Sequence, residues 1–223
     1  MRFLRRVRAE CLLLFPRLTR TRFGVSLLGL GVLLIWLSGR GLDSLSLALH
    51  AGALGAVIGA GYAVSGESDR AALRIALTHP TTSLAVATGR FLAAVLPAAV
   101  LVIATTVAIG WQPARAAAGV LAAAAVGSCA VAAVLTFGTG TVVPLFLLMA
   151  SAGAVPPERL VDLAHPGVVR LAAASALELG PALWHYRDIA FGDLGAIAHA
   201  LAWTGLGVLL ASAMIGRATR IHR

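Results

Sequence analysis

The chain alternates long apolar runs with short polar ones, and this pattern predicts its elements. A helix needs about 20 apolar residues to cross a bilayer, so runs with almost no charged residue mark candidate spans. The run 116–157 is too long for one span and breaks at Gly138-Thr139-Gly140, so we interpret it as two. The pattern predicts an all-α integral membrane protein with six transmembrane helices, over residues 23–39, 43–65, 90–110, 115–137, 141–155 and 194–215.

The first 22 residues are amphipathic instead. Apolar side chains recur there at helical spacing: Phe3, Leu4, Val7, Cys11, Leu14, Phe15 and Leu18. Arginines occupy the other face, beginning with Arg2, Arg5, Arg6 and Arg8. We expect an interface helix over residues 1–22 that lies on the anionic inner leaflet, with Pro16 bending or ending it. A signal peptide is disfavoured because no small-residue cleavage site follows, while a plain basic cytosolic lead-in stays open.

A polar segment, Gly66–Arg90, separates the second and third predicted spans. Ser68 can cap a helix that begins at Asp69, and Pro80 would end it. A new helix is expected to start at Thr81-Thr82-Ser83. Loops between bundle helices are commonly about 2–8 residues long, and this segment is longer. It is therefore either a docking surface or a passive interfacial turn.

Composition and charge place this pattern in a membrane. Of 223 residues, 59% are hydrophobic and 12% charged, against about 25% charged in soluble domains. The mean hydropathy is +0.91. Thirteen of the 18 arginines precede the first span, lie within Gly66–Arg90 or follow the last span, and five lie elsewhere. The positive-inside rule therefore predicts that both termini and this segment are cytoplasmic, as in a multi-pass protein of a bacterial inner membrane.

The remaining polar signals fall between spans. Ser38–Gly41 predicts an outer turn, after which Asp43 or Ser44 can cap the next helix. Gly55 and Gly59 predict close helix packing within one subunit. The segment 156–193, between the fifth and sixth spans, alternates apolar and charged residues, which suggests short helices dipping into the outer leaflet. The expected aromatic anchors of the outer interface are Trp36, Trp111, Trp184 and Tyr186.

Candidate chemistry is sparse. The six histidines show no metal-ligand spacing, and no catalytic set or cofactor motif stands out. His50 and His199 lie within predicted spans, where an ionisable group is a functional candidate, although packing with satisfied hydrogen bonds is the alternative. His185 and Asp188 are interpreted as anchoring groups rather than catalytic ones. All 18 basic residues are Arg, and a P-loop needs a Lys to reach the phosphates, so ATP binding by that route is excluded.

Two stretches carry a family resemblance. One runs from Glu67 to Arg74, continues through Leu77-Thr78-His79-Pro80-Thr81-Thr82-Ser83 and ends at Gly89-Arg90. The other is Pro181–Asp193, which leads into the last span. With the six spans and the amphipathic start, these stretches resemble the permease subunit of ABC-2 type transporters. Arg90 stands where that family frequently has Lys.

The resemblance implies a coupling helix within residues 66–89 that docks on a separate ATP-binding cassette ATPase. The residues it implies for docking are Glu67, Ser68, Asp69, Arg70, Arg74, His79, Pro80, Thr81 and Thr82. It also implies re-entrant helices in 156–193, a permease homodimer or heterodimer with two ATPases, and export of a substrate, with ATP hydrolysis on the other chain. A haem-exporter B-type subunit and a non-transporting membrane scaffold or assembly factor are the alternatives.

Overall fold

The computed structural model describes residues 2–20, 23–64, 82–140, 142 and 180–220, and every element in these ranges is a helix. Four of them are long and apolar enough to cross a membrane. They are α3 (Ser44–Val64), α5 (Ser83–Ile109), α6 (Pro113–Phe137) and α11 (Leu194–Arg220). The chain is therefore a multi-pass membrane protein, and the second, third, fourth and sixth predicted spans coincide with these helices.

The helix at the first predicted span is shorter than the four helices of spanning length. Helix α2 (Phe23–Ser38) lies where it was expected, but it has only 16 residues. At about 1.5 Å per residue it covers about 24 Å, less than the roughly 30 Å hydrocarbon core of a bilayer. The fifth predicted span, 141–155, lies outside the described residues except for Val142. Six spans therefore remain a prediction.

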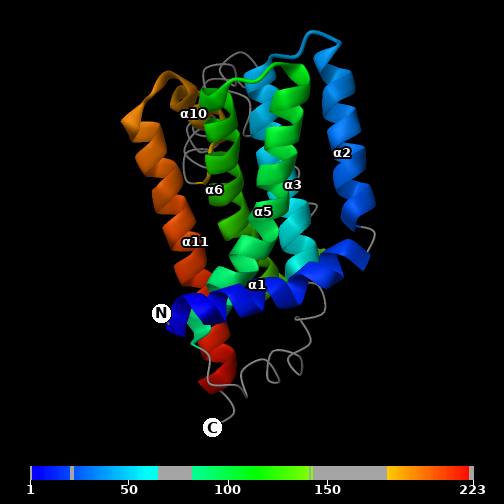
Figure 1. Ribbon diagram of the computed structural model, residues 1–223. Helices are drawn as coiled ribbons and strands as arrows, with labels where there is room; N and C mark the ends of the chain where they lie inside the picture. The colour runs from blue at the N-terminus through cyan, green and yellow to red at the C-terminus, as the bar shows by residue number, and fades with distance from the viewer. Residues whose placement is uncertain (1, 21–22, 65–81, 141, 143–179, 221–223) are drawn as a thin grey trace, which may run out of the picture.

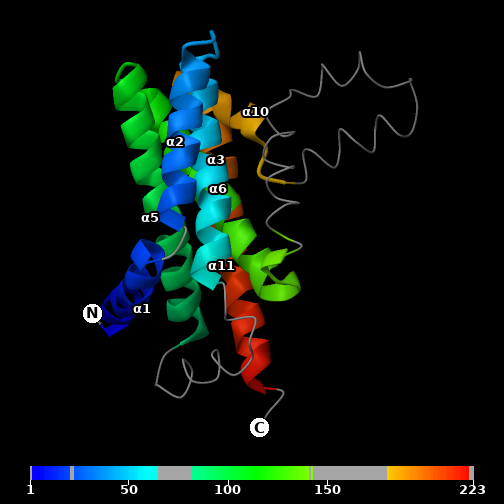
Figure 2. The same cartoon turned by 90° about the vertical axis from the view of Figure 1, so that its right-hand side faces the viewer.

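The four long helices form a bundle with α3 inside it (Figure 1). Helix α3 packs against α5 and α6, α11 packs on α6 and α5, and α2 covers α3 and α5 from one side. Helix α1 (Arg2–Arg20) runs across the foot of the bundle and contacts mainly α5. Figure 2 shows the same arrangement from the side, with the N-terminal helix and the end of α11 both at the foot.

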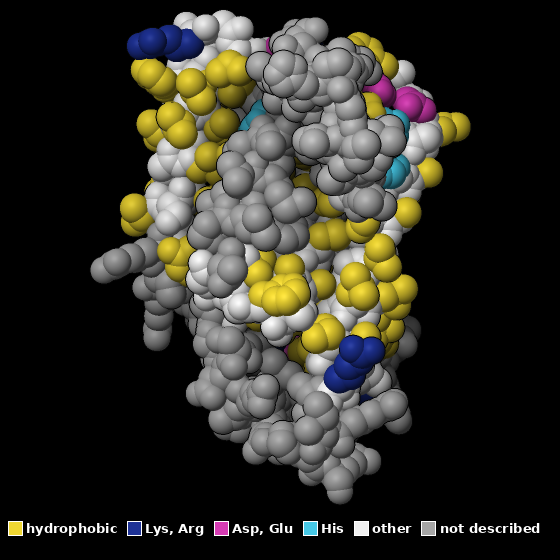
Figure 3. All heavy atoms as spheres, turned by 180° about the vertical axis from the view of Figure 1, so that it is seen from behind, with side chains coloured by type: hydrophobic (Ala, Val, Ile, Leu, Met, Phe, Trp, Pro, Cys, Tyr) yellow, Lys and Arg dark blue, Asp and Glu magenta, His cyan; other side chains and the backbone are white. Residues whose placement is uncertain are grey.

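The outer surface of the bundle is apolar. Exposed side chains include Val25 of α2, Val100 of α5 and Leu209 of α11, which are 74%, 66% and 62% exposed. In Figure 3 hydrophobic side chains cover most of the described length, and charged ones gather toward its two ends. Such a surface suits contact with lipid rather than water.

Small residues bring the helix backbones together. A Cβ added at Gly59 would collide with the backbone of Ala94 in α5, and one at Gly55 would lie 3.2 Å from the Cβ of Ala98. A Cβ at Gly52 would collide with the backbone of Gly119 in α6. The prediction that Gly55 and Gly59 serve packing within one chain is confirmed.

This packing makes Gly59→Leu destabilising. The added side chain has no space against Ala94, so α3 and α5 must separate, and overpacking of this kind typically costs about 1–3 kcal/mol. Thermal unfolding in detergent measures the effect. The matched control is Gly29→Leu on α2, where an added Cβ meets nothing within 4 Å. Equal melting temperatures for the two variants would show that α3 and α5 are not in close contact.

Helix ends follow local signals, with three differences from expectation. Gly138, at φ 83°, ends α6 where the break was predicted. Helix α1 continues through Pro16 to Arg20, so the proline removes one backbone donor without ending the helix. Helix α11 continues to Arg220, beyond the predicted end at residue 215, because Gly216 keeps helical geometry. The third difference is at α5.

Helix α5 begins at Ser83, which confirms the helix start expected at Thr81-Thr82-Ser83 but lies ahead of residue 90, where the third span was predicted to begin. The side-chain oxygen of Thr82 accepts a hydrogen bond from the backbone N–H of Ala85 at 3.3 Å, and so caps the helix. Residues 83–89 therefore belong to the membrane helix and not to the segment predicted over 66–89. Arg90 lies in the second turn of this helix, where its charge has to be neutralised by the protein.

Candidate functional site

Most of the predicted docking residues lie outside the described part of the chain. This holds for Glu67, Ser68, Asp69, Arg70, Arg74, His79, Pro80 and Thr81. Thr82 is described, and its side chain caps α5. The described chain leaves the bundle at Val64 and re-enters it at Thr82, and both points lie at the foot that α1 crosses (Figures 1 and 2).

A buried ion pair joins α1 to α5 at this foot. Oε2 of Glu10 lies 3.1 Å from Nη1 of Arg90, and the two side chains are only 10% and 5% exposed. Removing two charges from water costs several kcal/mol per ion, and close charge-assisted hydrogen bonding offsets it. Each charge is therefore tolerable here because the other is present.

The local sequence of α1 places Glu10 against α5. Val7, Glu10 and Cys11 are three and four residues apart, share one helix face and are all buried. Gly89 makes the close approach possible, because a Cβ there would lie 2.5 Å from the Cβ of Glu10. Helix α1 is thus held on α5 by both shape and charge.

The predicted apolar face of α1 is divided between protein and surroundings. Val7 and Cys11 are buried, whereas Phe3 and Leu4 are 42% and 70% exposed. Of the predicted membrane-surface arginines, Arg5 and Arg8 are exposed and Arg6 is half-buried. The side chain of Arg2 lies outside the described residues. Exposed apolar and basic groups on one helix fit a position at a membrane surface.

Helix α5 is also joined to α11. The hydroxyl groups of Ser83 and Ser212 lie 3.1 Å apart, and a Cβ at Gly216 would be in van der Waals contact with Ser83. The first two turns of α5 therefore contact α1 on one side and the end of α11 on another. We call the set Glu10, Ser83, Gly89, Arg90 and Ser212 the foot cluster.

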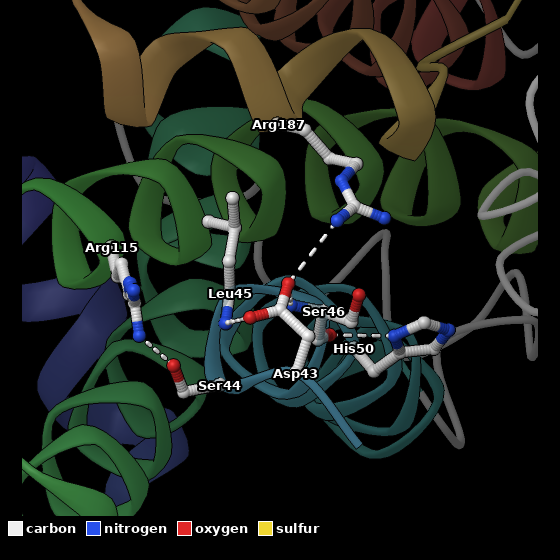
Figure 4. Close-up of polar contacts among 7 residues, drawn as sticks. All are labelled: Asp43, Ser44, Leu45, Ser46, His50, Arg115 and Arg187. Atoms are coloured by element: carbon white, nitrogen blue, oxygen red, sulfur yellow. Dashed lines mark hydrogen bonds and ion pairs between the residues drawn. The ribbon is translucent and has the colours of Figure 1, made fainter. Parts of the chain in front are cut away.

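A second polar group lies at the opposite end, around the start of α3 (Figure 4). The carboxylate of Asp43 accepts hydrogen bonds from the backbone N–H groups of Leu45 and Ser46, which confirms it as the predicted cap. Nη2 of Arg187, in the 3-10 helix η1 (Arg187–Phe191), lies 3.1 Å from the same carboxylate, and Arg115 of α6 donates to Ser44. Both partners of the Asp43–Arg187 pair are nearly half exposed, so it contributes at most about 1 kcal/mol.

The histidines within spans differ from each other. Nδ1 of His50 lies 2.6 Å from the backbone oxygen of Ser46 in its own helix, a contact that fits the packing alternative. His199 is only half satisfied, since Nε2 has a partner and the buried Nδ1 has none. Nδ1 of His185 lies 4.0 Å from Oδ2 of Asp188, which is too long for a hydrogen bond and makes at most a weak ion pair.

The aromatic anchors also divide into two kinds. Trp36 and Trp111 are 54% and 53% exposed, in accordance with an interfacial position, and Arg40 stacks 4.4 Å from the ring centre of Trp36. Tyr186 is wholly buried, so its prediction as a surface anchor is wrong. It lies at the end of α10 (Leu183–Tyr186), which packs against α6 and α11.

Comparison with known proteins leaves these sites to be interpreted from their own geometry. No protein-family model, no curated protein and no solved structure matches this chain.

Sequence reasoning missed Glu10. Its signal was available, because Glu10 is the sole acidic residue before Asp43 and falls on the apolar side of an arginine-rich helix. A lone acid on a buried face implies a basic partner, and Arg90 is the single charged residue within the apolar helix α5.

Proposed function

We propose that this chain is the permease subunit of an ATP-driven exporter of the ABC-2 type. In this proposal a separate ATP-binding cassette ATPase docks on residues 66–82 and moves the membrane helices. The observation that carries the proposal is the foot cluster. The start of α5, which directly follows that segment, is joined by a buried ion pair to a membrane-surface helix.

The foot cluster can transmit a displacement. The segment 65–82 connects the end of α3 to the start of α5, so a push on it acts first on those two helices. Separating Glu10 from Arg90 would break a buried ion pair, and breaking such a pair typically costs about 3–5 kcal/mol. Helix α1 therefore moves with α5, and the Ser83–Ser212 contact extends the movement to α11.

The energy source in this proposal is another chain. All 18 basic residues are arginines, so the lysine of a P-loop is missing, and the chain itself is a transport subunit rather than an enzyme. Two permease copies would pair with two ATPases. The position in a bacterial cytoplasmic membrane is part of the same proposal.

Co-purification tests the proposal. The chain is co-expressed with the ATP-binding cassette ATPase encoded nearest to it and purified in detergent through its own tag. A stoichiometric complex that dissociates when residues 66–82 are replaced by a Gly/Ser linker supports docking at this segment. A scaffold would purify without the ATPase. A complex whose ATP hydrolysis rises only with added haem would favour a haem-exporter B-type subunit.

The arginine distribution predicts that both termini are cytoplasmic. Arg90 is paired with Glu10 inside the protein, so it is left out of the count of loop and terminal arginines. Twelve arginines (13 − 1) then remain on the predicted cytoplasmic side, against five on the other side. Tags at residues 1 and 223 should be protected from protease in intact cells, and a cleavage site inserted at the Arg40 turn should be accessible. Cleavage of a terminal tag from outside would overturn this orientation.

A further inference from the structure

Five rings form a cluster between α10 and the first turns of α11: Trp184, His185, Tyr186, His199 and Trp203. His199 is at the centre of the cluster. Its ring centre lies 5.3 Å from that of His185, 5.6 Å from that of Tyr186 and 6.2 Å from that of Trp203. These residues belong to neither the foot cluster nor the predicted docking segment.

The cluster contains buried polar atoms that have no partner. In the described part of the chain, the buried side-chain nitrogen and oxygen atoms without a hydrogen bond are Nε1 of Trp184, Oη of Tyr186 and Nδ1 of His199. Leaving such an atom unsatisfied costs about 1–3 kcal/mol. Buried polar groups elsewhere in proteins are nearly always paired. That all three lie in one ring cluster indicates a place where another molecule supplies the missing bonds.

Each of these three atoms is a hydrogen-bond donor. The indole Nε1 of Trp203 donates to Nε2 of His199 at 3.0 Å, so the proton of the neutral imidazole ring lies on Nδ1. An indole nitrogen only donates. Burial, followed by the proximity of Cys129, raises the pKa of Tyr186, which therefore keeps its phenolic proton. A group that carries several acceptor oxygens could therefore satisfy all three atoms.

We propose that the ring cluster binds the oxygen-rich headgroup, a phosphate or carboxylate, of an amphiphile whose chain remains in the bilayer. Phosphate and carboxylate oxygens are strong acceptors that need no donor of their own. His199 is the sixth residue of α11, about 7.5 Å along the helix from its start. Leu206, which follows His199 by seven residues and Trp203 by three on the same face of this helix, is 44% exposed, so an apolar chain has lipid-facing surface beside the cluster.

Thermal stabilisation of the purified full-length chain in a neutral maltoside detergent tests this site. The probes are dodecyl phosphate, inorganic phosphate and dodecyltrimethylammonium, which has the same chain but no acceptor. We expect dodecyl phosphate to raise the melting temperature with a saturable concentration dependence, and dodecyltrimethylammonium to have no such effect. Equal stabilisation by inorganic phosphate would identify a soluble anion as the source of the same chemistry. Stabilisation by neither phosphate probe would overturn the site.

Variants that remove one hydrogen-bond donor each assign the site to the cluster. Tyr186→Phe and Trp184→Phe each remove one donor, and each should raise the apparent Kd for dodecyl phosphate about tenfold. The matched controls are Tyr62→Phe, whose ring meets the edge of Phe23, and Trp111→Phe, which is exposed. Wild-type affinity in both cluster variants would contradict the proposal.

The probe-free protein gives an independent check. Because the hydroxyl group of Tyr186 has no partner, Tyr186→Phe should leave the melting temperature unchanged or raise it. A clear fall would mean that the hydroxyl is already satisfied inside the protein, and would overturn the site. None of these measurements requires an ATPase, so their outcome is separate from that of the transporter proposal.

Discussion

Glu10→Ala should destabilise the protein by about 3–5 kcal/mol and abolish stimulation of the partner ATPase. The variant removes the carboxylate that lies 3.1 Å from the guanidinium group of Arg90, which stays buried in α5. It also loosens α1 from the helix whose first turns would receive the movement of the docking segment. Thermal unfolding in detergent measures the first effect, and ATP hydrolysis by the reconstituted complex measures the second.

Two further variants separate the ion pair from general damage to α1. Arg8→Ala changes an exposed charge on the same helix and should change stability by no more than about 0.5 kcal/mol. Replacing Glu10 and Arg90 together by Leu and Met should recover much of the stability, because apolar pairs often replace buried ion pairs without loss. The account would be wrong if Glu10→Ala and Arg8→Ala had the same melting temperature.

The double change Arg70→Glu and Arg74→Glu should lower stimulation of the partner ATPase at least tenfold while leaving membrane insertion intact. In the proposed interface these arginines, four residues apart, lie on the polar face that meets the ATPase, so two charge reversals place repulsive groups in the contact. Like charges across a contact cost several kcal/mol, which is more than a tenfold effect requires. ATP hydrolysis and the yield of membrane-inserted protein are measured together.

The matched control for this change reverses Arg217 and Arg220 at the end of α11. It alters the charge on the same predicted side of the membrane by the same amount, outside the proposed contact. Stimulation should survive there. Loss of stimulation in both double variants would indicate a general charge effect, and its survival in both would remove the docking role of Arg70 and Arg74.

Elements that depend on local chemistry were predictable from the sequence. Asp43 caps α3, Thr82 caps α5 and Gly138 ends α6, because each feature is decided by a side chain or backbone preference within a few residues. Four long apolar runs likewise became four helices of spanning length. The bounds of α2 also match the predicted run to within one residue, but its 16 residues are too few to reach both surfaces of a bilayer, because an apolar run sets where a helix can lie without requiring that it span.

Contacts between distant segments could not be predicted in the same way. Arg90 resembles a charge at the boundary of a span, and its buried ion pair is made by Glu10 of α1, 80 residues earlier in the chain. Tyrosine is a residue type typical of the membrane interface, but the burial of Tyr186 depends on where α6 and α11 lie around it. In both cases the environment is made by other helices, and a hydropathy pattern along one segment does not contain it.

In the proposed function, an external ATPase drives this membrane protein through residues 66–82. The most direct measurement is ATP hydrolysis by the partner ATPase in lipid nanodiscs, alone and with the purified wild-type chain. We expect the wild-type chain to increase the rate, and the Arg70→Glu, Arg74→Glu variant, inserted to the same level, to leave it unchanged. An unchanged rate in the presence of the folded wild-type chain would contradict the proposed function.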